Sequence, residues 1–264
     1  MCALLQYQKI IFLCGISNIF KASALVALGP SDRMIISPSV AKADFLNLGQ
    51  DLSEAIDGGA EWLHFSVQDG KMVPKVSIGS PVVSACKDAF PNTVMDVKLG
   101  CIEPENRIQE FAKAGADILS VHPESTLQLA AVIHQIDQMG IAPGVILNPG
   151  TSISMVEHVL EQCKVVVVML VNPGHGGPKY METAIEKIRS LRLLKPDLHI
   201  SVDGGVNEQN AQDLVKAGAN VLVAGGSVFK AKNKAFAIGE LKNSYPDSTA
   251  YIYGRQFVRA NSYR

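Results

Sequence analysis

Residues 199–227 have the sequence HISVDGGVNEQNAQDLVKAGANVLVAGGS, and they contain the unit from which the fold is built. Two short apolar segments, His199–Val202 and Val221–Ala224, flank a segment with helical spacing of its apolar residues, Glu208–Ala217. Each apolar segment is soon followed by paired glycines, and the helical segment ends at Gly218, where a helix commonly needs a left-handed residue. A strand, a helix and a second strand joined in this way predict parallel pairing of the two strands.

The same unit recurs from Met34 to Lys242. Strands are expected at Met34–Ser39, Trp62–Val67, Val94–Leu99, Ile118–Val121, Gly144–Leu147, Val165–Val171, His199–Val202 and Val221–Ala224. Helices are expected near Leu48–Asp57, Pro81–Ala89, Glu105–Ala114, Gln128–Met139, Ser154–Gln162, Met181–Leu194, Glu208–Ala217 and Lys232–Leu241. This alternation fits a closed barrel or an open doubly wound sheet. Three helices end in the near-identical turns Asp57-Gly-Gly-Ala60, Lys113-Ala-Gly-Ala116 and Lys216-Ala-Gly-Ala219, and this recurrence favours the barrel. We therefore predict one α/β domain, a (β/α)8 TIM barrel over residues 34–242.

The composition is that of a globular protein, with 47% hydrophobic and 19% charged residues in 264. This length suits a single α/β barrel of about 250 residues. The formal net charge is −1 and there is no long basic run, so nothing indicates a nucleic-acid partner. The 5 cysteines are widely spaced without a Cys-x-x-Cys pair, which indicates a reducing compartment and no disulfide framework.

Both ends differ from the predicted barrel. Residues 1–33 contain no acidic residue before Asp32, and Lys9 and Lys21 flank an apolar run from Ile10 to Phe20. That run is too short for a membrane span, which needs about 20 residues. A targeting peptide, secretory or plastid, is one interpretation, and a disordered extension or a wrongly assigned start is the other. Residues 243–264 lack helical periodicity, and we expect a poorly ordered tail there rather than a partner-binding extension.

Glycine-rich turns follow the last three predicted strands, at the end of the barrel where active sites lie. Their sequences are Asn172-Pro-Gly-His-Gly-Gly177, Asp203-Gly-Gly205 and Gly225-Gly-Ser227. Glycines let backbone N–H groups approach an anion closely. Turn chemistry alone also uses glycine, but three consecutive strand ends of this kind favour a phosphate site. The residues expected to bind phosphate are Gly174, Gly176, Gly177, Gly204, Gly205, Gly225, Gly226 and Ser227.

Ionisable side chains point to the same end of the barrel. The polar residues expected to face inward on the second and third strands are His64, Ser66, Gln68, Asp96 and Lys98. A lone inward histidine is more often a hydrogen-bonded core residue than a ligand. Here His64 and Lys98 should converge with Asp203 from the seventh strand, so a functional site is the stronger interpretation.

Several motifs in order resemble the ribulose-phosphate 3-epimerase family over about 210 residues. They are Ile36-Ser-Pro-Ser39, Trp62-Leu-His64, Asp69-Gly70 with Val73-Pro74, Asn148-Pro-Gly-Thr151, Val171-Asn-Pro-Gly174 with Gly176-Gly177, and Val202-Asp-Gly-Gly205. The Asn-Pro-Gly forms are more similar to the bacterial and plastid branch than to the animal branch.

The resemblance implies a pentose phosphate or Calvin pathway enzyme that interconverts ribulose 5-phosphate and xylulose 5-phosphate. In that family a divalent metal (zinc, manganese or iron) polarises the C2 ketone, and two aspartates exchange the C3 proton from opposite faces. The family's metal ligands are two histidines and those aspartates, of which His64 and Asp203 are retained; Ser39 and His64 belong to the substrate site. The resemblance also implies a homo-oligomer, since members are commonly dimers or hexamers, and a plastid location, with the cytoplasm as alternative.

The chain departs from the family pattern where the chemistry is done. At the second strand the family has His-x-Asp-x-Met-Asp-Gly, but this chain has Ser66 in place of the first Asp and Gln68 in place of the Met. At the third strand the family has Asp-x-His-x-Met, but this chain has Lys98 in place of the His and Gly100 in place of the Met. A serine hydroxyl is a poor base, and an ammonium group repels a metal ion. We therefore expect no metal cofactor, with His64 and Asp203 as vestigial ligands, and weak or lost epimerase activity.

Two alternatives remain open at this point. In the first, the protein is a metal-independent isomerase in which Lys98 stabilises an enediolate and Asp203 moves the proton. Asp96-Val-Lys98 resembles the start of the Asp-x-Lys-x-x-Asp pattern of the orotidine-monophosphate decarboxylase group, although Cys101 replaces its last residue. His175, which replaces the family's phenylalanine, is then a substitute proton carrier, and Ser66 completes the expected catalytic set with Lys98 and Asp203. In the second, the protein is a non-catalytic sugar-phosphate-binding or regulatory partner.

Overall fold

The computed structural model describes residues 28–175 and 181–244. Most of the expected N-terminal extension, nearly all of the expected tail, and Gly176 and Gly177 lie outside the described residues. Eight strands form one sheet: β1 Ile35–Pro38, β2 Trp62–Gln68, β3 Val94–Gly100, β4 Ile118–Val121, β5 Ala142–Leu147, β6 Val165–Met169, β7 His199–Asp203 and β8 Val221–Ala224. The α-helices are α2 Leu48–Asp57, α3 Ser80–Ala89, α4 Ile108–Lys113, α5 Leu129–Gln138, α6 Met181–Leu194, α7 Glu208–Ala217, α8 Gly226–Phe229 and α9 Lys234–Lys242.

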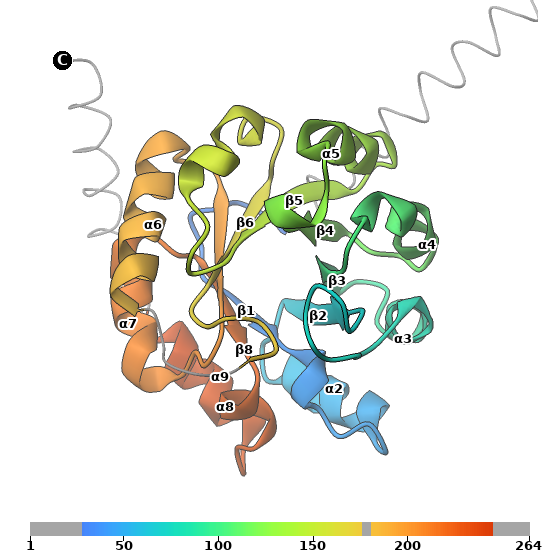
Figure 1. The fold of residues 1–264 in the computed structure, drawn as a ribbon. Helices are drawn as coiled ribbons and strands as arrows, with labels where there is room; N and C mark the ends of the chain where they lie inside the picture. The colour runs from blue at the N-terminus through green and yellow to red at the C-terminus, as the bar shows by residue number, and fades with distance from the viewer. Residues whose placement is uncertain (1–27, 176–180, 245–264) are drawn as a thin grey trace, which may run out of the picture.

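All strand pairs are parallel, and the sheet closes on itself. The strand order runs β1-β8-β7-β6-β5-β4-β3-β2. At the remaining seam, Ser39 forms a parallel bridge with His64, and the Glu61 N–H donates to the Ile36 carbonyl oxygen at 3.2 Å. Helices surround this ring of strands (Figure 1). The predicted (β/α)8 barrel is thus confirmed, and the open sheet is excluded.

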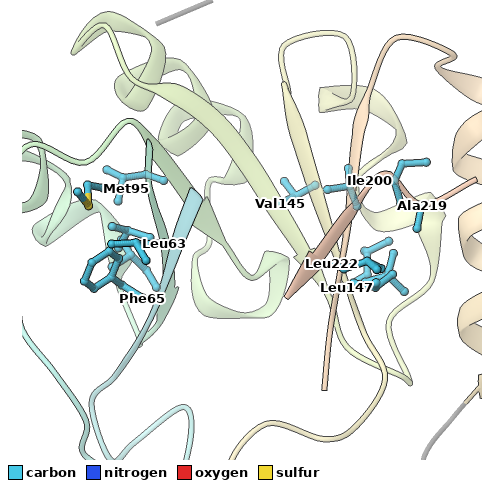
Figure 2. Close-up of a cluster of buried hydrophobic side chains, with 14 of the residues drawn as sticks. Leu63, Phe65, Met95, Val145, Leu147, Ile200, Ala219 and Leu222 are labelled. Atoms are coloured by element: carbon cyan, nitrogen blue, oxygen red, sulfur yellow. The ribbon is translucent and has the colours of Figure 1, made fainter. Parts of the chain in front are cut away.

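Alternation along the strands divides the apolar residues into two layers. A smaller cluster fills the inside of the barrel and includes Trp62, Ile146 and Val167. A larger cluster fills the space between the strands and the surrounding helices, and it includes Leu63 and Phe65, the neighbours of Trp62 and His64 that point outward (Figure 2). Because side chains on a strand alternate in direction, the same alternation turns His64 and Ser66 into the barrel.

The recurring turns behave as their sequence predicts. Gly59, Gly115 and Gly218 have positive φ values of 102°, 87° and 122°. A side chain there would be strained, so glycine is required where each helix turns into the next strand.

The prediction of an α-helix at Ser154–Gln162 is wrong. The segment forms two 3-10 helices instead, η4 Ile153–Met155 and η5 Glu157–Val159. Its inward apolar residues Ile153, Val156 and Val159 are spaced three apart, the repeat of a 3-10 helix, but residues three apart also share a face of an α-helix, so this spacing fits both.

No helix in the described part of the chain is both long and apolar enough to cross a membrane.

A buried histidine, His199, lies at the start of β7, at the amino-terminal end of the barrel strands. His199 Nδ1 lies 3.1 Å from Asn220 Nδ2, which can only donate, and His199 Nε2 lies 3.2 Å from the Gly29 carbonyl oxygen. The ring is therefore neutral, with its proton on Nε2. Burial lowers the pKa of His199 to about 4, with the hydrogen bond to Gly29 opposing and the Arg192 and Arg33 charges adding to the effect.

Acid should therefore destabilise the fold through His199. The pKa of His199 in the folded protein lies below the ordinary value of 6.5. The contribution of the neutral ring to the free energy of unfolding is therefore complete above pH 6.5 and is lost as the pH falls towards 4. At about 1.4 kcal/mol per pH unit, the loss should reach about 3 kcal/mol. Urea unfolding at about pH 7 and about pH 4.5 measures it, and His199→Gln should lose less stability on acidification than the wild type. Equal losses in the two proteins would contradict this assignment.

Candidate functional site

Four ionisable side chains meet near the ends of the strands. His64 Nδ1 lies 2.6 Å from Asp96 Oδ2, and His64 Nε2 lies 3.7 Å from Asp203 Oδ2. The Lys98 ammonium donates to the same Asp203 oxygen. The side chains of His64 and Asp96 are fully buried, and those of Lys98 and Asp203 are 4% and 15% exposed. The predicted convergence of His64, Lys98 and Asp203 is thus present in the structure.

Strand register explains this arrangement. In the β2–β3 pair, His64 lies opposite Asp96 and Ser66 lies opposite Lys98, so each inward side chain has an inward neighbour. Lys98 then reaches across the barrel mouth to Asp203 at the end of β7, and its Nζ also lies 3.7 Å from Met169 Sδ.

The charges around Asp203 keep it ionised. Burial is the largest single influence and raises its pKa, but Lys98, His64, the hydrogen bond from Lys98 and the Gly204 N–H together lower the pKa below the ordinary value of 3.8. Asp203 is therefore a carboxylate at neutral pH. It can accept a proton from a carbon acid held beside it, while Lys98 offers positive charge to a developing oxyanion.

A pocket of about 940 Å³ opens above this ion pair. Ten of the residues expected in the site line it: Ser39, Ser66, Lys98, Gly174, Asp203, Gly204, Gly205, Gly225, Gly226 and Ser227. The glycine turns after β7 and β8 are held together, since Ser227 Oγ donates to the Val206 carbonyl oxygen at 2.8 Å.

Gly204 needs to be glycine on two grounds. Its φ is 119°, and a Cβ there would lie 2.8 Å from Val171 Cγ2. Its small size therefore lets the β7 turn pack closely against the end of β6.

Two of the other expected residues, His64 and His175, do not line this pocket. His64 lies beneath it, with its Nε2 3.7 Å from Asp203 Oδ2. His175 lines a different pocket, and its Nδ1 lies 3.0 Å from the Pro173 carbonyl oxygen. Gly176 and Gly177 lie outside the described residues.

Lys42 was not among the residues expected in the site. This lysine ends the short 3-10 helix η1 Val40–Lys42, and it lines the pocket beside the β8 turn. A Cβ at Gly225 would lie 2.8 Å from Lys42 Cγ, so the lysine stem lies directly against that glycine. Its position just after the first strand is the signal that could have revealed it, because barrel sites are built from such loops.

Among the described residues, no group of three or more His, Cys, Asp or Glu side chains is arranged to hold a metal ion.

The fold and this pocket define a (β/α)8 barrel with a charged site at the carboxyl ends of its strands, the usual place for the active site of such barrels. More narrowly, the chain belongs to the ribulose-phosphate 3-epimerase family, whose model matches residues 35–229.

Curated relatives are similar over most of their length. The chloroplastic ribulose-5-phosphate-3-epimerase of Arabidopsis thaliana is 42% identical over 86% of this chain and 83% of its own. The ribulose-phosphate 3-epimerase of Bacillus subtilis is 41% identical over 79% of this chain and 98% of its own. The enzyme of Synechocystis is 40% identical, with coverage of 81% and 95%.

Solved structures with lower identity share the fold. KGPDC from Streptococcus mutans has a TM-score of 0.62 at 15% identity, over 80% of this chain and 97% of that one. 3-Hexulose-6-phosphate synthase from Salmonella typhimurium also has a TM-score of 0.62, at 16% identity, with coverage of 80% and 98%.

Proposed function

We propose that this protein binds a pentose phosphate of the ribulose 5-phosphate type and epimerises it weakly or not at all. The observation that carries this proposal is the ion pair between Lys98 and Asp203, with Ser66 beside it, at the centre of a pocket that keeps the family's glycine turns. The glycines support binding, and the ion pair argues against the family's metal chemistry.

The residues present do not fit a divalent metal. Of the family's four ligands, His64 and Asp203 remain, and the Lys98 ammonium already contacts the Asp203 oxygen that lies toward His64. Binding a metal there would require Lys98 to leave or lose its proton, and Ser66 to ligate in place of a carboxylate. Every step proposed for this chain therefore uses its own side chains.

Lys98 supports a second candidate, a metal-independent isomerase. Its ammonium lies in the pocket next to a carboxylate, where it could stabilise an enediolate while Asp203 takes the proton. A non-catalytic role, as a sugar-phosphate-binding or regulatory partner, would use the same pocket to bind the ligand without converting it.

Ligand binding can be tested by titration calorimetry with ribulose 5-phosphate. We expect binding at millimolar ligand or below, and Lys42→Ala should weaken it about fivefold through loss of one exposed cation near the phosphate. Lys113→Ala is the matched control, because Lys113 is exposed at the end of α4 and does not line the pocket. Folded protein that releases or absorbs no heat with millimolar ligand would refute the binding proposal.

We further propose a homo-oligomer in the plastid. The similarity to a chloroplastic enzyme supports the compartment, while similarly close bacterial enzymes support the cytoplasm as alternative. Fusion of residues 1–33 to a fluorescent protein tests the compartment, and light scattering of the purified protein tests the oligomer.

A further inference from the structure

A second pocket of about 540 Å³ lies at the ends of β4, β5 and β6. The first pocket is lined mainly from the other strands, and the two adjoin at Pro173, which lines both. The second is lined by Met72, Val73, His122, Glu124, Asn148, Gly150, Thr151, Met155, Asn172, Pro173 and His175.

Two buried side chains in this pocket have polar atoms without partners. His122 is fully buried, and neither of its ring nitrogens has a hydrogen-bond partner among the described residues. The nearby carboxylate oxygen, Glu124 Oε2, is 3.9 Å from His122 Nδ1, which is too long for a hydrogen bond. Asn148 Oδ1 is likewise buried and unpaired within the described chain. Since buried polar atoms are nearly always hydrogen-bonded, these atoms indicate a missing polar partner.

The walls of the pocket are fixed in place. Glu124 Oε1 accepts hydrogen bonds from Asn148 Nδ2, at 3.2 Å, and from Thr151 Oγ1. Lys187 Nζ donates to the carbonyl oxygens of Asn148 and Pro149, both at 2.7 Å. These contacts join the loops after β4 and β5 to α6, so they fix the positions of Glu124 and Asn148 in the wall of the pocket.

The unpaired atoms specify the chemistry of that ligand. Burial, and after it the Lys98 charge, lowers the pKa of His122 to about 3, so its ring is neutral with one donor and one acceptor nitrogen. Asn148 Oδ1 and the Glu124 carboxylate accept only. Hydroxyl groups both donate and accept and therefore match the set. An ammonium group cannot accept from the imidazole, and a phosphate would face Glu124.

The remaining walls suit the carbon chain of such a ligand. Met72, Val73 and Met155 supply apolar surface, against which C–H groups of a polyol can pack.

We propose that this pocket holds the non-phosphorylated, hydroxyl-bearing end of a sugar phosphate longer than five carbons, whose phosphate lies at the glycine turns of the first pocket. The proposal rests on the sugar-phosphate function proposed above and extends it to chain length. The chain of the ligand would pass the Lys98–Asp203 pair and Pro173 on its way between the pockets.

Two unreactive probes test the proposal, ribitol 5-phosphate and glucitol 6-phosphate, which are acyclic and differ by one carbon and its hydroxyl. Titration calorimetry should show the six-carbon probe binding about five- to tenfold more tightly, as expected for one or two added hydrogen bonds. His122→Phe removes the unpaired nitrogens, and Met155→Trp narrows the pocket from a side chain that is 50% exposed. Both variants should abolish the preference and leave ribitol 5-phosphate binding within twofold. Leu127→Trp, at a 99% exposed position outside the pocket, is the matched control and should bind like the wild type.

The outcomes separate this inference from the function on which it rests. If ribitol 5-phosphate binds and the six-carbon probe binds no more tightly, the inference fails and the proposed function stands. If neither probe binds, both the inference and the proposed function fail. A preference that survives in Met155→Trp also overturns the inference, even if His122→Phe does not fold. Glucitol without phosphate should bind far more weakly than glucitol 6-phosphate, and equal binding would show a separate polyol site instead.

Discussion

Turnover of ribulose 5-phosphate should be slower than in ordinary family members by several orders of magnitude. Inversion at C3 requires one group to remove a proton and another to return one from the opposite face, and Asp203 can serve one face only. Loss of the second general acid–base group should cost roughly 10²–10⁴-fold. Loss of the metal should add several kcal/mol to the barrier unless Lys98 compensates. The two losses act on one transition state, so they should not add fully. A coupled assay for xylulose 5-phosphate measures the rate, and a rate typical of the family would refute the proposal.

The double change Ser66→Asp with Lys98→His should restore metal binding and part of the activity. It returns a carboxylate and an imidazole beside His64 and Asp203, and it removes the ammonium. Elemental analysis should find about one metal per chain in the variant and none in the wild type. Ser66→Asp alone is the control and should restore neither, because the new carboxylate would face Lys98.

Recovery should remain partial, because of Gly100. A Cβ at this position would lie 3.2 Å from the Val67 carbonyl oxygen and 3.2 Å from Val73 Cγ2. The methionine that the family has there cannot return without movement of these neighbours.

If instead the wild type turns over substrate in the presence of chelators, and Lys98→Ala abolishes that rate, the lysine-based route is correct.

Asp203→Asn should lower the free energy of unfolding by about 3 kcal/mol at pH 7. The substitution leaves Lys98, 4% exposed, without a carboxylate partner in a site that already contains His64. An unpaired buried charge costs more than the pair contributes. Urea unfolding measures the change, and a loss below about 1 kcal/mol would show that water reaches Lys98 freely.

A double-mutant cycle isolates this effect from packing. Lys98→Met removes the ammonium and keeps a side chain of similar length. In that background, Asp203→Asn should lower the free energy of unfolding by much less. The folded pKa of Asp203 lies below 3.8, so its contribution is present above that pH and is lost as pH falls through the folded value. The single variant and the wild type should therefore converge in stability at low pH.

Periodicity predicted the barrel because each strand and helix repeats the same local pattern. It failed at residues 153–159, where apolar residues three apart fit either kind of helix and two 3-10 helices form. The convergence of His64, Lys98 and Asp203 was predictable, since parallel strands place their ends at one rim. The pairing of His64 with Asp96 depends on strand register, and the place of Lys42 depends on how a loop folds back, so neither follows from spacing alone.

The register between Ser66 and Lys98 also determines what single substitutions can do at this site. These residues are opposite one another on adjacent strands, and a ligand set like that of the family would need both of them changed. An aspartate introduced first at position 66 would face the Lys98 ammonium and form a second ion pair. A histidine gained first at position 98 would leave Asp203 without its cation while the ligand set was still incomplete. Each single step therefore leaves the ligand set incomplete, and only the two changes together supply both a carboxylate and an imidazole.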